Sequence, residues 1–171
     1  MTPPPVVKEY VPLAPFTTFG VGGAARWFAS ISSIDELAEV FAFCKQGNIP
    51  WMVLGKGSNC LFDDRGYEGI VLLNKLNQMK EIGDGRFFAE SGYSFARLGA
   101  NTARNGWSGL EFASGIPGSV GGAVYMNAGA NGSDTSKVVQ AVDFLFEDGV
   151  RKTFHRDELH FGYRHSPFQQ M

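Results

Sequence analysis

Glycine is concentrated in residues 115–132, where six of the eighteen positions are glycine. Each glycine loses more conformational freedom on folding than any other residue, so such a cluster is unfavourable in an ordinary helix or strand. Glycine suits places where backbone N–H groups approach a ligand, most naturally a phosphate. A mobile linker is the alternative, but flexible linkers are polar, whereas Ile116, Val120 and Val124 are interleaved here. We therefore expect a packed loop that cradles a ligand.

A second candidate loop, Gly55–Asn59, directly follows the apolar segment Pro50–Leu54. In an open α/β sheet, ligands bind at the carboxyl ends of the strands. The two glycines of the loop free its backbone, its lysine could supply charge to a phosphate, and its last two residues add short hydrogen-bonding side chains. The spacing is not that of a Walker A loop. A tight turn with an exposed lysine is the alternative, and this loop taken alone does not decide between the two.

A dinucleotide-binding pattern, G-x-G-x-x-A, is formed by Gly20, Gly22 and Ala25. We reject it, because that fingerprint follows a strand and opens a helix. Here the next residues, 26–31, look like a strand.

Metal and disulfide chemistry are not expected. Cys44 and Cys60 form no Cys-x-x-Cys pair and no zinc spacing, so they are interpreted as reduced thiols of a cytosolic protein. The helical spacing around Cys44 indicates packing, not catalysis. His155, His160 and His165 have no supporting metal motif, so hydrogen-bonded or solvated histidines are expected.

Composition limits the class of protein. The 171 residues suit one domain or two small lobes, and 15 basic against 17 acidic residues give a net charge of −2. There is no basic run to indicate nucleic-acid binding. The longest aliphatic run, Ile70–Leu73, is too short for a membrane span. The first five residues lack the charged and apolar regions of a signal peptide.

The elements that would carry the two loops can be predicted from periodicity. Ser33 and Glu36 form a capping box that starts a helix with Gly47 as its stop. With the flanking strands 26–31 and 50–54, this helix predicts a βαβ unit with a parallel pair. Further predicted elements are strands at 70–73, 86–90, 138–146 and 151–154, a hairpin turn at 147–149, and a second helix at 94–105.

Four ordered segments resemble the N-terminal part of the UDP-N-acetylenolpyruvoylglucosamine reductase (MurB) family of peptidoglycan synthesis. They are Thr18–Gly23, Leu54–Asn59, Leu110–Ala123 continuing through Met126–Gly129, and Tyr163–Ser166. Together they span nearly the whole chain. Their shared order and spacing are specific to this family, whereas any one segment alone would not be.

The resemblance implies an α+β fold of the vanillyl-alcohol oxidase (PCMH) type. Residues 1–15 would be an extended segment, 16–73 a small parallel βαβ lobe, and 74–171 a larger antiparallel lobe with helices, with FAD between the lobes. The family has a further C-terminal substrate domain with a serine proton donor, which we expect to be absent from a chain that ends at Met171.

The resemblance also implies a reaction, in which the enolpyruvyl ether of UDP-N-acetylglucosamine is reduced to UDP-N-acetylmuramate. FAD would be bound non-covalently and NADPH would be the hydride donor. Arg164 would be catalytic, with Tyr163, Arg164 and Asn127 binding substrate. The implied cofactor-binding residues are Gly55, Lys56, Gly57, Ser58, Asn59, Gly115, Ile116, Pro117, Gly118, Ser119, Gly121, Gly122 and Ala123. The alternative for Arg164 is a weak surface ion pair.

We expect a cytoplasmic monomer that binds no metal, nucleic acid or membrane. Two other functions remain open. One is another flavin oxidoreductase of the same fold, although covalent attachment of FAD at Cys60 is not expected. The other is a non-catalytic FAD-binding module.

Overall fold

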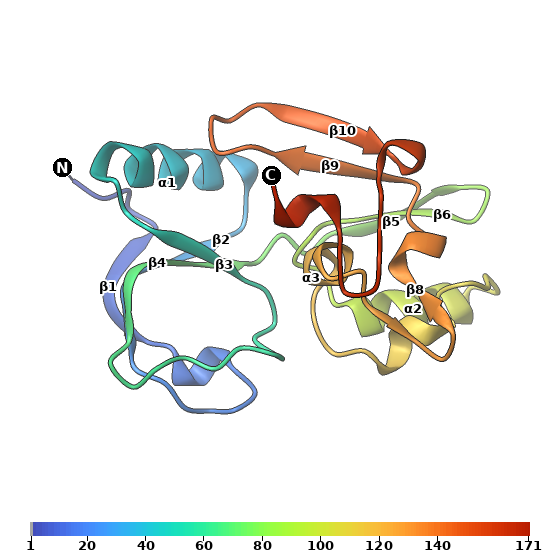
Figure 1. Cartoon of the computed structure of the whole chain (residues 1–171), viewed down its shortest axis with the longest axis horizontal. Helices are drawn as coiled ribbons and strands as arrows, with labels where there is room; N and C mark the ends of the chain where they lie inside the picture. Colours follow the sequence, from blue (N-terminus) through green and yellow to red (C-terminus); the bar gives the residue numbers. More distant parts are fainter. Residues whose placement is uncertain (1) are drawn as a thin grey trace. The chain divides into compact units, whose positions relative to one another are not determined.

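The computed structural model describes residues 2–171, which form two compact units (Figure 1). The first unit ends at Leu76, and the second spans Asn77–Met171. Met1, part of the predicted segment 1–15, lies outside the described residues. No helix among residues 2–171 is both long and apolar enough to cross a membrane.

The first unit is built on a four-stranded sheet with the order β1-β2-β4-β3. Its strands are β1 (Val7–Pro12), β2 (Ala24–Ile31), β3 (Trp51–Leu54) and β4 (Tyr67–Asn74). β4 pairs in parallel with both β2 and β3, and β1 pairs antiparallel with β2. The short 3₁₀ helix η1 (Ala14–Phe16) follows β1.

The predicted βαβ unit is present, but its two strands are not neighbours. β2 and β3 are both parallel to β4, which lies between them. The reason is burial, because residues 70–73 of β4 are all buried, as expected for a central strand that is covered on both faces. The extended N-terminal segment supplies β1, the antiparallel edge strand.

The connecting helix α1 (Ile34–Gly47) starts at the predicted capping box. Ser33 Oγ accepts a hydrogen bond from the Glu36 N–H at 3.2 Å, and Glu36 Oε2 accepts from the Ser33 N–H at 3.2 Å. At the other end, the left-handed residue is Asn48 (φ 48°), not the predicted Gly47, which is the last helical residue. Asparagine tolerates this conformation better than most residues.

Two layers of apolar side chains cover the sheet of the first unit. α1 packs its aromatic residues on one face, with Phe41 and Trp51 ring centroids 5.0 Å apart. A separate buried cluster is formed by Leu13, Ala25, Phe28, Leu54, Phe62, Val71 and Leu73.

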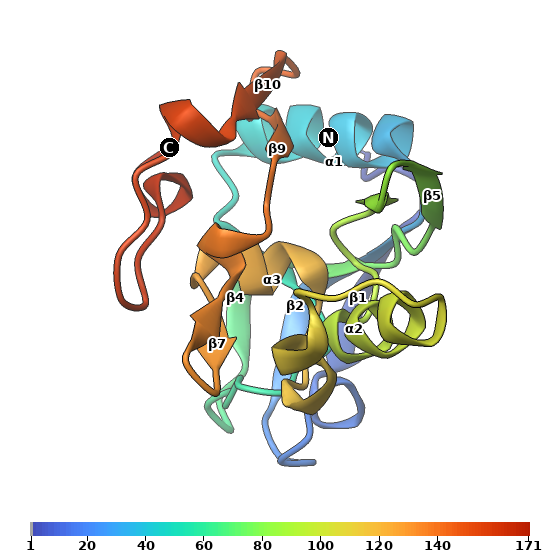
Figure 2. The ribbon, with the colours of Figure 1, turned by 90° about the vertical axis from the view of Figure 1, so that its right-hand side faces the viewer.

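The second unit contains three two-stranded antiparallel sheets, of which the β9–β10 pair is seen in Figure 2. Its strands are β5 (Met79–Gly83), β6 (Arg86–Ala89), β7 (Gly129–Ala130), β8 (Ser133–Asp134), β9 (Ala141–Leu145) and β10 (Arg151–His155). Its α-helices are α2 (Phe95–Arg104) and α3 (Val120–Tyr125). Its 3₁₀ helices are η2 (Glu111–Gly115), η3 (Thr135–Lys137), η4 (Arg156–Glu158) and η5 (Pro167–Gln169).

The predicted hairpin of the second unit is confirmed, although β9 begins only at Ala141. The glycine-rich stretch differs from the prediction of a loop. Residues 120–125 form helix α3 despite their two glycines, because Ser119 caps the helix by accepting from the Gly122 N–H at 3.3 Å. Ala123 of this helix is buried in an apolar cluster with Phe95 and Phe112.

Candidate functional site

The loop Gly55–Asn59 follows β3, at the carboxyl end of a parallel strand. The Thr18 N–H donates to the Gly57 carbonyl at 3.0 Å, and the Thr18 hydroxyl lies 3.4 Å from the carbonyl oxygens of Gly57 and Ser58. Gly57 has a φ of +63°, and a Cβ there would lie 1.9 Å from the Phe16 carbonyl oxygen. Only glycine therefore fits at this point of the loop.

Carbonyl groups of this loop accept hydrogen bonds from Thr18, whereas four of its N–H groups have no acceptor among the described residues. The N–H groups of Gly55, Lys56, Gly57 and Asn59 donate to no acceptor among residues 2–171. Successive unsatisfied N–H groups in a turn form a concave anion site. The exposed side chain of Lys56 adds a positive charge to the same loop. The loop could therefore hold an anionic group such as a phosphate.

The glycine-rich stretch before α3 offers fewer free donors than the sequence indicates. The Val120 N–H donates to the Tyr93 carbonyl and the Gly121 N–H to the Ser91 carbonyl, both at 2.8 Å. A Cβ at Gly121 would lie 2.9 Å from Ser91 Cβ, so this glycine permits close packing within the protein.

The free donors of this stretch are next to the helix. The N–H groups of Gly118 and Ser119 have no acceptor among the described residues, and Gly118 has a φ of +135°. Ile116 is half-buried, and Gly115 is exposed with no atom within 4 Å of an added Cβ. The backbone N–H groups of this stretch that remain able to bind a ligand are therefore those of residues 118 and 119.

Tyr163 and Arg164 form the tip of a two-residue turn. The Gly162 N–H donates to the His165 carbonyl at 3.0 Å, and the His165 N–H returns a bond to the Gly162 carbonyl at 3.2 Å. Arg164 has a φ of +54°. Its Cζ atom lies 5.6 Å from the centroid of the Tyr163 ring, and Tyr163 is 92% exposed. The turn presents a cation and an aromatic ring together.

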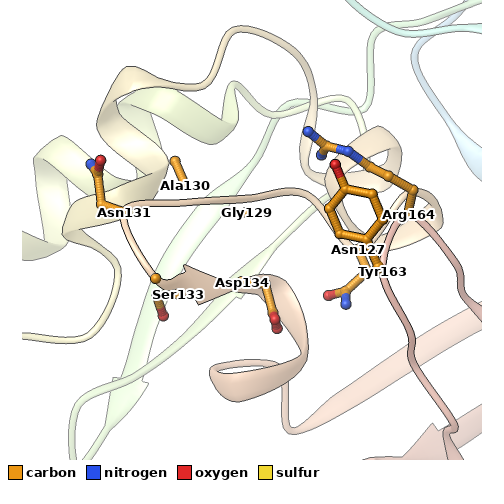
Figure 3. Close-up of a pocket in the computed structure, with 9 residues that line it drawn as sticks. Asn127, Gly129, Ala130, Asn131, Ser133, Asp134, Tyr163 and Arg164 are labelled. Carbon is orange, nitrogen blue, oxygen red and sulfur yellow. The ribbon is translucent and has the colours of Figure 1, made fainter.

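These two residues line a cavity of about 340 Å³ with Asn127 and the β7–β8 hairpin. Figure 3 shows the Tyr163 and Arg164 side chains beside one another at one end of this cavity, with Asn131 at the other. The lining residues are Asn127, Gly129, Ala130, Asn131, Gly132, Ser133, Asp134, Tyr163 and Arg164.

The Asn127 amide is already occupied by protein partners. Its Nδ2 donates to the Gly162 carbonyl at 2.9 Å, and its Oδ1 accepts from the Ser136 N–H at 2.9 Å. The residue is only 7% exposed. Asn127 therefore fixes the base of the Tyr163–Arg164 turn to the segment that follows β8.

Sequence reasoning gave no role to the β7–β8 hairpin or to Gln169. The hairpin could have been found, because Asn131-Gly132 is a strong signal for a two-residue turn, and both residues have positive φ. Gln169 had no such signal, since its contacts depend on the folding of a distant segment. Neither Cys44 nor Cys60 forms a disulfide, and residues 2–171 hold no group of three metal-ligating side chains.

The sequence from residue 25 to residue 154 matches the family described as the FAD binding domain. The chain belongs to this family.

The chain also resembles UDP-N-acetylenolpyruvoylglucosamine reductases, as the motifs predicted. It is 50% identical to the one from Protochlamydia amoebophila over 159 residues, which is 93% of this chain and 53% of that protein. The chain thus spans about half the length of the curated relatives that it matches.

Solved structures agree on the fold. The MurB crystal structure from Thermus caldophilus is 36% identical with a TM-score of 0.75, covering 92% of this chain and 56% of that one. p-Cresol methylhydroxylase, at 18% identity, has a TM-score of 0.57 over 85% of this chain and 29% of that one. The predicted α+β fold of the vanillyl-alcohol oxidase (PCMH) type is confirmed.

Proposed function

We propose that this chain binds FAD non-covalently and that the Gly55–Asn59 loop holds the pyrophosphate. One observation carries the proposal. The N–H groups of Gly55, Lys56, Gly57 and Asn59 have no acceptor among the described residues. Backbone N–H groups bind phosphate without the steric hindrance of side chains, and the positive φ of Gly57 gives the loop its turn.

In this proposal, fewer residues of the Gly115–Ala123 segment contact FAD than the sequence indicated. The N–H groups of Gly118 and Ser119 are free to donate, whereas those of Val120 and Gly121 serve the fold. Half-buried Ile116 is available as an apolar contact for a ring of the cofactor.

The proposed reaction is reduction of the enolpyruvyl ether of UDP-N-acetylglucosamine, the substrate in the names of the relatives. NADPH is the hydride donor that we propose. Bound FAD would supply the hydride-carrying chemistry. Arg164 would bind the substrate carboxylate and stabilise negative charge that develops beside it, because its own charge is fixed. Tyr163 would cover the same ligand with its ring. NADPH and a nucleotide sugar as substrates are consistent with a cytoplasmic protein. We also propose that the protein is a monomer.

A non-catalytic FAD-binding module is the second candidate, and the family match favours it, since that match describes an FAD binding domain at residues 25–154. The two candidates are separated by mixing the purified chain with FAD, NADPH and the enolpyruvyl substrate. Formation of UDP-N-acetylmuramate would support the reductase, and bound FAD without turnover would support the module.

Arg164→Lys sharpens this test, because lysine keeps the charge and loses the planar fork. If the chain turns over, we expect kcat to fall roughly 10²-fold, as for the loss of one transition-state donor, with FAD still bound. An unchanged kcat would contradict the role given to Arg164.

A further inference from the structure

The Tyr163–Arg164 turn is tied to α3 by one glutamine. Gln169 Nε2 donates to the Arg164 carbonyl at 3.2 Å and to the Tyr125 carbonyl at 3.1 Å. Its Oε1 lies 3.1 Å from His165 Nδ1. The amide group thus joins the tip of the turn, the residue after it, and the end of α3.

The backbone of Arg164 needs such support. Its φ of +54° is in the left-handed region, which is unfavourable for a side chain of this size. Residues held in such a conformation persist when the surrounding structure over-determines them, and they cluster at functional sites. At Arg164, the surrounding structure includes Gln169 on the carbonyl and Asn127 at the base of the turn.

We propose that Gln169 is a positioning residue for Arg164. Its amide nitrogen lies within hydrogen-bond distance of two carbonyl oxygens, one on the arginine itself and one at the end of α3, and 3.6 Å from Met126 Sδ. Holding the Arg164 carbonyl fixes the orientation of the Cα–Cβ bond from which the side chain extends, and so limits the region that the guanidinium can reach. The inference rests on the proposed function, in which Arg164 faces the substrate carboxylate.

A purely space-filling role for Gln169 makes a different prediction. Gln169→Glu keeps the length and shape of the side chain but replaces the donor of both bonds by an acceptor. Gln169→Lys removes the amide and keeps a donor on a long unbranched chain. If Gln169 positions Arg164, Gln169→Glu should disturb the turn and Gln169→Lys should preserve it. If Gln169 only fills space, the isosteric Gln169→Glu should leave the turn unchanged.

The first readout needs no ligand. We expect Gln169→Glu to speed hydrogen exchange of the His165 N–H about tenfold, the effect of losing one or two net hydrogen bonds. Gln169→Lys should remain within about twofold of the wild-type rate on the same scale. Gln170→Glu is the matched control, because its side chain is exposed and it should leave exchange unchanged. Equal exchange rates in Gln169→Glu and wild type would overturn the proposal.

The second readout is the dissociation constant of UDP-N-acetylglucosamine enolpyruvate for the FAD-loaded chain. A positioning role predicts about tenfold weaker binding in Gln169→Glu, rescue in Gln169→Lys, and unchanged FAD affinity in both. Unchanged substrate affinity in Gln169→Glu would overturn it. A wild-type chain that takes up FAD and binds no substrate would contradict the proposed substrate role of Arg164, and the exchange rates would then decide on Gln169 by themselves.

Discussion

Ser166 Oγ donates to the Tyr125 carbonyl at 2.7 Å, joining two residues that are 41 positions apart. Ser166 is completely buried. The bond fastens the segment behind the Tyr163–Arg164 turn to the C-terminal end of α3. The position of Arg164, for which we propose a catalytic role, therefore depends on this contact within the second unit.

Replacing Ser166 by alanine should destabilise the fold by about 1 kcal/mol, the net value of a typical hydrogen bond. The cost stays small because the Tyr125 carbonyl keeps its second donor, Gln169. Urea unfolding followed by fluorescence measures the change. Ser108→Ala, at an exposed residue, is the control, and equal effects of both substitutions would contradict this account.

Gly57→Ala should damage the first unit far more than Gly20→Ala. Both glycines have similar φ, +63° and +67°, so the conformational strain of alanine is matched. A Cβ at Gly57 would lie 1.9 Å from the Phe16 carbonyl oxygen, whereas a Cβ at Gly20 would have no atom within 4 Å. We expect Gly20→Ala to cost about 1–2 kcal/mol from strain alone, and Gly57→Ala clearly more. Melting temperatures decide, and similar values would refute the steric argument.

The capping box of α1 should contribute less stability in acid. Hydrogen bonds from Ser32, chiefly from its backbone N–H, and from the Ser33 N–H lower the pKa of Glu36 below its ordinary value. A group whose pKa is lowered by folding stabilises the protein above its unfolded-state pKa, and this contribution is lost as the pH falls through the folded-state pKa. Glu36→Ala should therefore be more destabilising at pH 7 than at pH 3. A destabilisation by Glu36→Ala that is the same at both pH values would contradict this prediction.

Cys60→Ser should leave FAD affinity within about twofold of wild type, because the Cys60 side chain packs against the apolar cluster of the first unit and serine is of similar size. Cys60 is a half-buried free thiol just after the Gly55–Asn59 loop. Fluorescence titration with FAD measures the affinity. A large loss with the fold preserved would assign the thiol a part in the cofactor site.

Local signals in the sequence predicted local structure well. The capping box of Ser33 and Glu36 located the start of α1, and the helix predicted at 94–105 agrees with α2 to within one residue at each end. The order of strands was beyond reach, since the insertion of β4 between β2 and β3 depends on pairing between distant segments.

The site shows the same division. Glycine content marked both loops, but composition cannot tell whether a missing side chain makes room for a ligand or for protein. Gly121 makes room for Ser91, whereas Gly57 makes room for the Phe16 carbonyl and leaves its own N–H free. The bond between Gln169 and Arg164 joins side chain to backbone and has no sequence signature.

The most direct test of the account is the absorbance spectrum of the purified chain after addition of FAD and removal of the unbound flavin. We expect a folded, yellow protein with one flavin per chain, released by acid because it is held without a covalent bond. Gly57→Ala should retain little flavin. A folded wild-type chain that retains no flavin absorbance at high FAD concentration would contradict the central claim.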